Sequence, residues 1–198
     1  IFGQVYLEAP ASPSEVYIMP HYNLQYGVGR FNFYTSYSGD MRKFDVVQKS
    51  NRSFQEAQGL GETSSIRHLI QNEWSHRFQY GVDYYMNEKN RFNFYGFYNP
   101  YSSEFDGEVE FQAQGDDMND LFWSAEKEDA DKNAMTFYSL YYKHLFREEQ
   151  AISLDMSYYN LRADHLSRYL ADDAPGNILF DPANRSKPVK NSWFMKLD

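Results

Sequence analysis

Apolar and polar residues alternate with a period of two along several stretches of this chain, whereas helical periodicity is nearly absent. In residues 73–86 the even positions hold Trp, His, Phe, Tyr, Val, Tyr and Met, while the odd positions are mostly polar or charged. Successive side chains of a β-strand point to opposite faces of its sheet. This stretch therefore predicts a strand with one aromatic face and one polar face.

The same alternation predicts six further strands, so that the fold class is all-β with about seven antiparallel strands. They are expected over residues 16–26, 30–38, 91–98, 134–146, 151–160 and 192–198. Within 134–146 the pattern leaves one point open, because either Lys143 or His144 must share the apolar face.

Two hairpin registers follow from short turns. A two-residue turn at 28–29 pairs Tyr26 with Phe31 and Leu24 with Phe33, which keeps apolar residues opposite apolar residues. A five-residue connection over 87–91 sets Tyr84 opposite Phe94. Gly96 then faces Val82 and leaves room for neighbouring rings.

Short and long connections alternate along the predicted strands. The long ones cover residues 39–64, 99–133 and 163–187. Long structureless loops are uncommon in compact soluble domains, but they are typical of the outer side of a transmembrane β-barrel with short periplasmic turns. We therefore predict such a barrel, with any bound ligand held by these three extracellular loops. In the third loop, 164–173 is expected to form a short amphipathic helix.

A soluble β-sandwich also alternates, with its apolar face turned inward, so alternation alone leaves both architectures open. Three features favour the barrel: the apolar face is mainly aromatic, the opposite face is charged and amide-rich, and the long loops lie on one side only. The alternative is a soluble all-β binding module of an exported protein, for example a glycan-binding module.

Composition narrows the class further. Aromatic residues make up 19% of the 198 residues, and the net charge is −9. There is no Cys and no apolar run near the roughly 18 residues of a transmembrane helix. The acidic balance argues against nucleic acid as a partner. Outer-membrane lipid is the partner that the predicted aromatic face requires.

Membrane-facing positions follow from the alternating pattern, and Trp74, Tyr84, Tyr85 and Trp193 are candidates for the interfacial belts where rings meet lipid headgroups. The full predicted set is Trp74, Phe78, Tyr80, Val82, Tyr84, Phe92, Phe94, Ile152, Leu154, Met156, Trp193 and Met195.

The chain is expected to be part of a larger barrel. Its 198 residues form a single β-barrel region in which no plug domain is visible. Bacterial barrels have even strand numbers, and an open strand edge is not viable in lipid. The remainder of the barrel is therefore an expected partner.

Residues 101–132 concentrate the negative charge, with eleven carboxylates and two lysines. Oxygen-rich loops hold calcium, so Asp116, Asp117 and Asp120 are weighed as metal ligands, although they do not match a calcium-loop pattern. A solvated outer loop is the simpler interpretation, so no metal site is assigned. Phe122 and Trp123, among these acids, are candidate ligand contacts or rings buried under the loop.

No catalytic or nucleotide-binding motif occurs, and the five His residues show no ligand spacing. The expected role is therefore non-catalytic and needs no cofactor.

Four segments taken in order resemble the barrel portion of TonB-dependent outer-membrane receptors, and more narrowly the outer-membrane β-barrel family of Bacteroidetes-type bacteria. They are QYGVGRFNFYTSYSGD, HRFQYGVDYYMNEKNRFNFYGFYN, QAISLDMSYYN and VKNSWFMKLD, and the resemblance spans residues 16–198. The element GVDYYMNEKNRFNF, a strand, a charged turn and an aromatic return strand, is the most specific.

This resemblance implies localisation in the cell outer membrane and a role in nutrient uptake. It also implies a plug in the lumen, energy from the TonB system, and a surface lipoprotein as a further partner. Neither a plug-like segment nor a TonB-contacting box is visible in the sequence, and the final barrel strand is missing.

Overall fold

The computed structural model describes residues 1–9, 16–56, 59–115, 118–147, 150–174, 177–180 and 183–198. Its ten strands form one antiparallel sheet, and the described residues contain no helix. The strands are β1 (Phe2–Glu8), β2 (Val16–Val28), β3 (Phe31–Glu56), β4 (Gly59–Asn87), β5 (Asn90–Gly115), β6 (Met118–Arg147), β7 (Gln150–Ala174), β8 (Asn177–Phe180), β9 (Ala183–Ser186) and β10 (Val189–Leu197).

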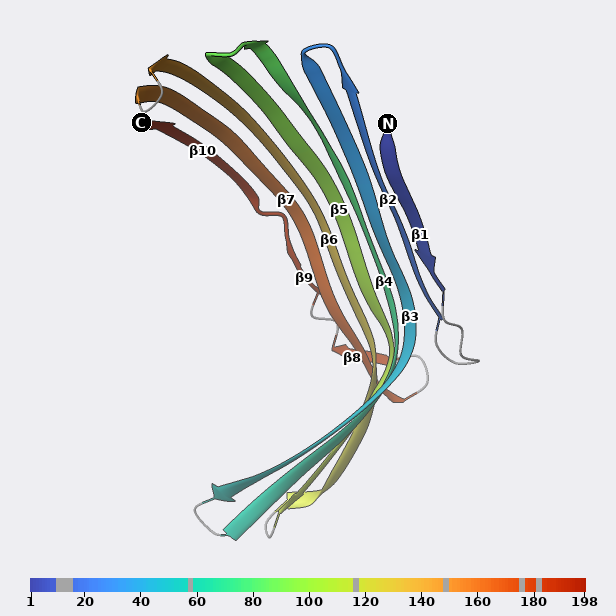
Figure 1. Ribbon diagram of the computed structural model, residues 1–198. Helices are drawn as coiled ribbons and strands as arrows, with labels where there is room; N and C mark the ends of the chain where they lie inside the picture. The colour runs from blue at the N-terminus through green and yellow to red at the C-terminus, as the bar shows by residue number, and fades with distance from the viewer. Residues whose placement is uncertain (10–15, 57–58, 116–117, 148–149, 175–176, 181–182) are drawn as a thin grey trace.

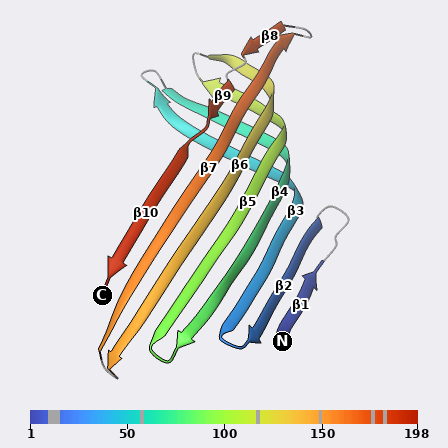
Figure 2. The same ribbon diagram turned by 90° about the horizontal axis from the view of Figure 1, so that it is seen from above.

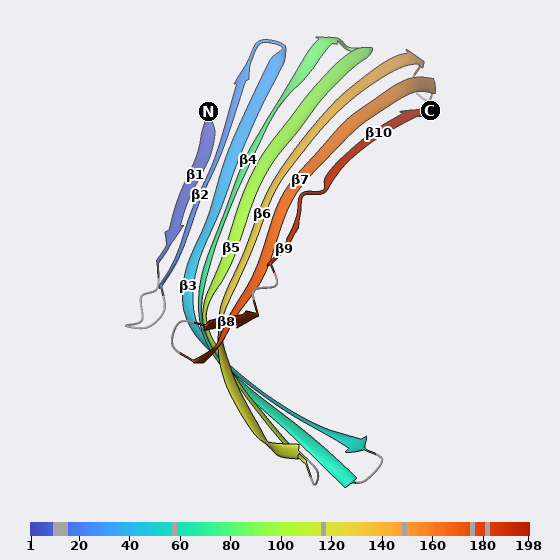
Figure 3. The same ribbon diagram turned by 180° about the vertical axis from the view of Figure 1, so that it is seen from behind.

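From β1 to β7, each strand pairs with the next strand in sequence. The other edge of β7 pairs with β10, so the order is β1-β2-β3-β4-β5-β6-β7-β10, and the short strands β8 and β9 also pair with β7. The sheet is a single curved layer, and the far ends of β3 to β6 bend away from the rest (Figure 1). Seen from behind, β8 lies close to this bend (Figure 3). The sheet is not closed, so the all-β antiparallel prediction is confirmed and the fold is compatible with part of a barrel.

The three short hairpins, β2–β3, β4–β5 and β6–β7, lie at one end of the sheet (Figure 2). We call the half of the sheet from these turns to the row of Trp74 the turn half, and the remainder the distal half. Five of the seven predicted strands lie within observed strands, and 30–38 and 192–198 each extend one residue beyond β3 and β10. β1 was not predicted, because its sequence FGQVYLE places apolar residues on both faces.

The three long loops are a wrong prediction. Most of 39–64 continues β3 and β4, most of 99–133 continues β5 and β6, and 163–187 contains the end of β7 with β8 and β9. Residues 164–173, expected as a helix, lie in β7. GEVEFQAQG (107–115) does alternate, as a short strand extension would, and it lies in β5. The other parts of these stretches lack one consistently apolar face, so the period-two signal of a half-buried strand is missing from them.

Both predicted hairpin registers are shifted. Val28 pairs with Phe31 and Tyr26 with Phe33, because the turn residues are Gly29 and Arg30. Gly29 has φ of 56°, a left-handed conformation that glycine adopts without steric cost. A shift of two residues preserves the face of every side chain, so the predicted faces hold.

In the second hairpin, Tyr84 pairs with Phe92 and Gly96 lies opposite Tyr80 rather than Val82. A Cβ on Gly96 would come within 2.9 Å of the Tyr80 ring and 3.1 Å of the Tyr138 ring. The glycine therefore does leave room for neighbouring rings, as predicted.

Candidate functional site

One continuous apolar face crosses the turn half of the sheet. In an antiparallel pair, directly opposite residues have side chains on the same face. The register therefore brings together a row of large apolar residues across seven strands: Val28, Phe31, Tyr84, Phe92, Tyr142, Leu154 and Leu197. His144 shares this face, so Lys143 lies on the opposite one, which resolves the ambiguity of 134–146.

All twelve positions predicted to face the membrane lie on this apolar face. Its rings contact one another across the strands, with centroids 4.6 Å apart for Phe31 and Tyr84 and 4.5 Å apart for Phe92 and Tyr142. Trp193 is 75% exposed and Phe78 is 43% exposed. No second layer of the described chain covers them.

Polar and aromatic groups meet where the apolar face ends. The Tyr37 hydroxyl lies 2.7 Å from His76 Nδ1, and the Trp74 ring centroid lies 5.2 Å from that of His76. Amphipathic rings of this kind suit a boundary between an apolar and an aqueous medium. Beyond Trp74, the same face carries Glu104, which forms an ion pair with Lys132 at 3.0 Å, and Asp106, which lies directly opposite Glu128.

The opposite face of the turn half is polar, and Asp83 is the centre of its best-connected network. This buried carboxylate accepts hydrogen bonds from Asn32 at 3.1 Å, Arg91 at 3.0 Å and Asn93 at 3.0 Å. Asn93 also donates to the Tyr34 hydroxyl at 2.9 Å. Three donors from β3 and β5 thus satisfy one charge that its burial would otherwise penalise.

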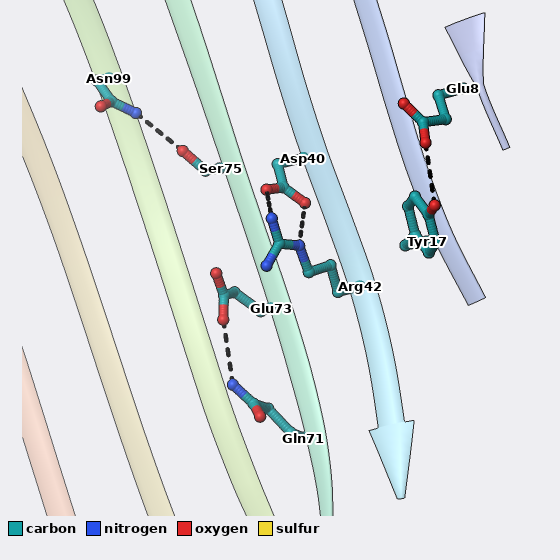
Figure 4. A network of polar contacts seen from close by, with 8 residues as sticks. All are labelled: Glu8, Tyr17, Asp40, Arg42, Gln71, Glu73, Ser75 and Asn99. Carbon is teal, nitrogen blue, oxygen red and sulfur yellow. Dashed lines mark hydrogen bonds and ion pairs between the residues drawn. The ribbon is translucent and has the colours of Figure 1, made fainter. Parts of the chain in front are cut away.

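A second set of polar contacts lies further along this face, where the end of β1 and the start of β2 meet the middle of β3 to β5 (Figure 4). The phenol of Tyr17 donates to Glu8 at 3.0 Å, and Arg42 forms a bidentate ion pair with Asp40. Gln71 donates to Glu73 at 3.1 Å on the neighbouring strand. The polar face is therefore lined by side chains that form hydrogen bonds and ion pairs with one another.

In the distal half, the face that is polar in the turn half carries buried apolar residues. Leu69, Val109 and Ala125 are buried on the side that is polar in the turn half. Beside them, the rings of Phe111 and Trp123 stack with centroids 4.2 Å apart and planes 13° apart. Trp123 is thus an ordered strand residue, and the expectation that it belongs to a loop is wrong.

Phe122 points to the other face of β6 and is 65% exposed, so the structure separates the two predicted ligand contacts. Asp116 and Asp117 lie outside the described residues, and Asp120 lies in β6. The described residues contain no group of three His, Asp or Glu side chains arranged to hold a metal ion. None of them forms a helix long and apolar enough to cross a membrane.

Acidic side chains line a groove of about 830 Å³ in the distal half, among them Asp106, Glu108, Glu126 and Glu128. Burial raises the pKa of the Asp106 carboxyl, and the neighbouring charges of Glu128 and Glu104 raise it further. The acid-rich segment of the sequence is therefore a pair of strands that repel each other, stabilised by their backbone ladder.

An ion pair that the sequence does not reveal ties β9 to β7. Arg185 donates to Asp164 through Nε at 2.9 Å and Nη2 at 2.7 Å, and Lys187 lies 3.3 Å from the same carboxylate. The Arg185 hydrogen bonds, with further help from Lys187, lower the pKa of Asp164 to about 2. On the other face, His165 Nδ1 lies 2.5 Å from Asp131.

No protein-family model matches the chain. No curated protein matches it either. Among solved structures, it is similar to the ferric citrate transporter FecA in its unliganded form, with a TM-score of 0.36 and 15% sequence identity. The match covers 99% of this chain and 35% of that one, so the chain spans about a third of the transporter's length.

Proposed function

We propose that residues 1–198 form part of the wall of a transmembrane β-barrel in an outer membrane, with the apolar face in lipid and the polar face towards the lumen. The observation that carries the proposal is the row of large apolar side chains in register across seven strands, each of them exposed or half-buried and none of them covered by a second layer of the described chain. A water-soluble sheet would need a second layer to cover such a face.

The height of the apolar face supports this assignment. Tyr84 and Trp74 are ten residues apart on β4, which corresponds to about 33 Å along a strand. For the tilt of about 45° common in barrels, the height is roughly 23 Å, close to the ~25 Å apolar band of outer-membrane barrels. Trp74 would then lie at one interface, with its ring among the headgroups.

The barrel would act as a non-catalytic receptor of the TonB-dependent type, taking up nutrients through a plugged lumen. This finer assignment, including the Bacteroidetes-type affiliation, the plug, the TonB system and a surface lipoprotein, rests on the sequence resemblance alone. In such a receptor the distal hairpins of β3 to β6 would replace the predicted loops as the ligand-capturing parts.

Three tryptophans provide the test. Trp193 lies in the same row as Tyr80, near the middle of the apolar face and not at its edge, where the sequence placed it in an interfacial belt. Trp74 lies at the edge, and Trp123 lies on the opposite face. Single-tryptophan variants would be reconstituted into vesicles containing lipids brominated at different depths. We expect deep bromines to quench Trp193 most strongly and shallow bromines to quench Trp74, while Trp123 keeps its fluorescence.

The soluble module predicts a different result. A chain that stays monodisperse without detergent, melts cooperatively, and shows no lipid quenching of Trp193 would overturn the barrel proposal. The Trp123 variant is the internal control, because loss of its fluorescence would reveal nonspecific access of lipid to both faces.

A further inference from the structure

We propose that the short-turn end of the sheet binds a phosphate group. A groove of about 930 Å³ lies there, between the β2–β3 turn, the β4–β5 turn and the start of the polar face. Its lining includes Arg30, Tyr85, Glu88, Lys89, Arg91 and Lys143. This proposal does not depend on the barrel being a nutrient receptor.

The groove is basic although the chain as a whole is acidic. Four cationic side chains line it against one carboxylate, that of Glu88, and Asp83 neutralises Arg91 from beside the groove. A net positive charge remains, in a protein whose net charge is −9. The cations come from three separate places in the sequence, namely Arg30, residues 89–91 and Lys143. Like charges gathered in one concavity repel each other and attract a multivalent anion.

Both arginines are held in place by contacts that leave donors available. Arg91 donates from Nη2 to Asp83 at 3.0 Å, and its guanidinium lies 5.2 Å from the centre of the Tyr85 ring. Arg30 donates from Nη1 to the carbonyl of Met86 at 2.6 Å. A guanidinium has five N–H donors, and each of these hydrogen bonds takes one.

The turns that carry the charges are also fixed to their neighbours. The backbone N–H of Tyr85 donates to the Arg30 carbonyl at 2.8 Å, and that of Leu145 donates to the Lys89 carbonyl at 2.8 Å. Within the β4–β5 turn, the Lys89 N–H donates to Asn87 Oδ1 at 3.0 Å. A site arranged in advance loses less entropy on binding than one that must assemble.

The donor set suits phosphate better than a carboxylate. A phosphate group offers several acceptor oxygens and up to about two negative charges. Arginine forks bind such oxygens in pairs, while lysine supplies a point charge. Two kinds of phosphate meet these requirements: a free phosphate or phosphate ester in solution, and a phospholipid headgroup. The groove lies at the same level of the sheet as Tyr84 and Phe92, whose side chains project from the opposite face.

The experiment is isothermal titration of inorganic phosphate into the purified full chain in detergent. We expect saturable binding, weaker at high salt because exposed charges are screened. Lys89→Gln combined with Lys143→Gln is expected to weaken binding at least tenfold. Lys49→Gln removes one positive charge at an exposed position in the distal half of β3 and should leave binding unchanged.

The two sources of phosphate are separated by competition with dihexanoyl-phosphatidylglycerol below its micelle concentration. Displacement of phosphate assigns the groove to a lipid headgroup, and no displacement assigns it to soluble phosphate. Absence of saturable phosphate binding, or equal weakening by Lys49→Gln, would overturn the proposal. The tryptophan quenching above does not involve this groove, so the two proposals can fail separately.

Discussion

The ring of Tyr34 occupies the space that a side chain at Gly81 would need. A Cβ built on Gly81 would lie 2.3–2.4 Å from two ring carbons and the hydroxyl oxygen of Tyr34. Tyr34 also accepts a hydrogen bond from Asn93 on the far side of the glycine strand and stacks at 6.5 Å on Tyr95. The glycine thus lets one aromatic side chain span three strands of the polar face.

Gly81→Ala should therefore displace the Tyr34 ring and break its hydrogen bond to Asn93. We expect a loss of about 1–3 kcal/mol in the free energy of unfolding, the usual range for overpacking. Chemical denaturation of the detergent-solubilised chain would measure it. Gly27→Ala is the matched control on the same face, because its Cβ would meet nothing closer than a carbonyl oxygen at 4.0 Å. Equal effects at both sites would contradict this role for Gly81.

Asp106→Asn should stabilise the protein at neutral pH. Asp106 lies directly opposite Glu128, and its pKa is raised by burial and by that charge and Glu104. A carboxyl with a raised pKa contributes most to stability below its unfolded pKa of about 3.9, and this contribution is lost as pH rises through the folded value. The gain from Asp106→Asn should therefore shrink as pH falls.

Thermal unfolding at a series of pH values would measure this difference between Asp106→Asn and the parent chain. Asp45→Asn is the control, since Asp45 is exposed on the same face opposite Ile70. A stabilisation by Asp106→Asn that stays constant down to acid pH would show that charge is not its cause.

The contact between β9 and β7 should be lost in acid. The folded pKa of Asp164 is lowered to about 2 by the Arg185 hydrogen bonds and by Lys187. Because the folded pKa is lowered, the ionised carboxylate stabilises the folded state above the unfolded pKa of about 3.9. This contribution is lost as pH falls through the folded pKa. Hydrogen exchange of the Ala163 amide, which donates to the Pro188 carbonyl at 3.0 Å, should report this loss between about pH 4 and pH 2.

At neutral pH, Asp164→Asn should likewise weaken the contact between β9 and β7. Trypsin would then cleave after Arg185 faster than in the parent chain, because β9 pairs with β7 over only four residues. Lys187→Gln keeps the bidentate Arg185 contact and should change cleavage much less. Unchanged cleavage in Asp164→Asn would mean that the backbone ladder alone holds β9.

The sequence predicts which residues share a face of the sheet far better than it predicts the lengths and registers of the strands. Trp74, Phe78 and Met156 share one face of the sheet, as predicted, because period-two alternation depends only on the parity of each position. The alternation cannot distinguish registers that differ by two residues. The shift at the Gly29 turn therefore changes the pairing partners but not the faces.

Strand length was missed where both faces of a strand are polar. In the distal half of β3, residues 48–53 read QKSNRS, so no apolar stripe marks them as a strand. The Asp83 network requires the correct pairing of Asn32 and Asn93 with that carboxylate, which only the true register supplies. The Asp164–Arg185 pair joins residues 21 apart across a return that sequence patterns do not define.

The meander order of the sheet also bears on how it assembles. Because β2 to β7 each pair with the next strand along the chain, every hairpin from β2 to β7 can close by zippering outward from its own turn. Loop-closure entropy stays small at each such step, and the next ladder extends an edge that already exists. The sheet can thus form one hairpin at a time along the chain, without waiting for its edge strands.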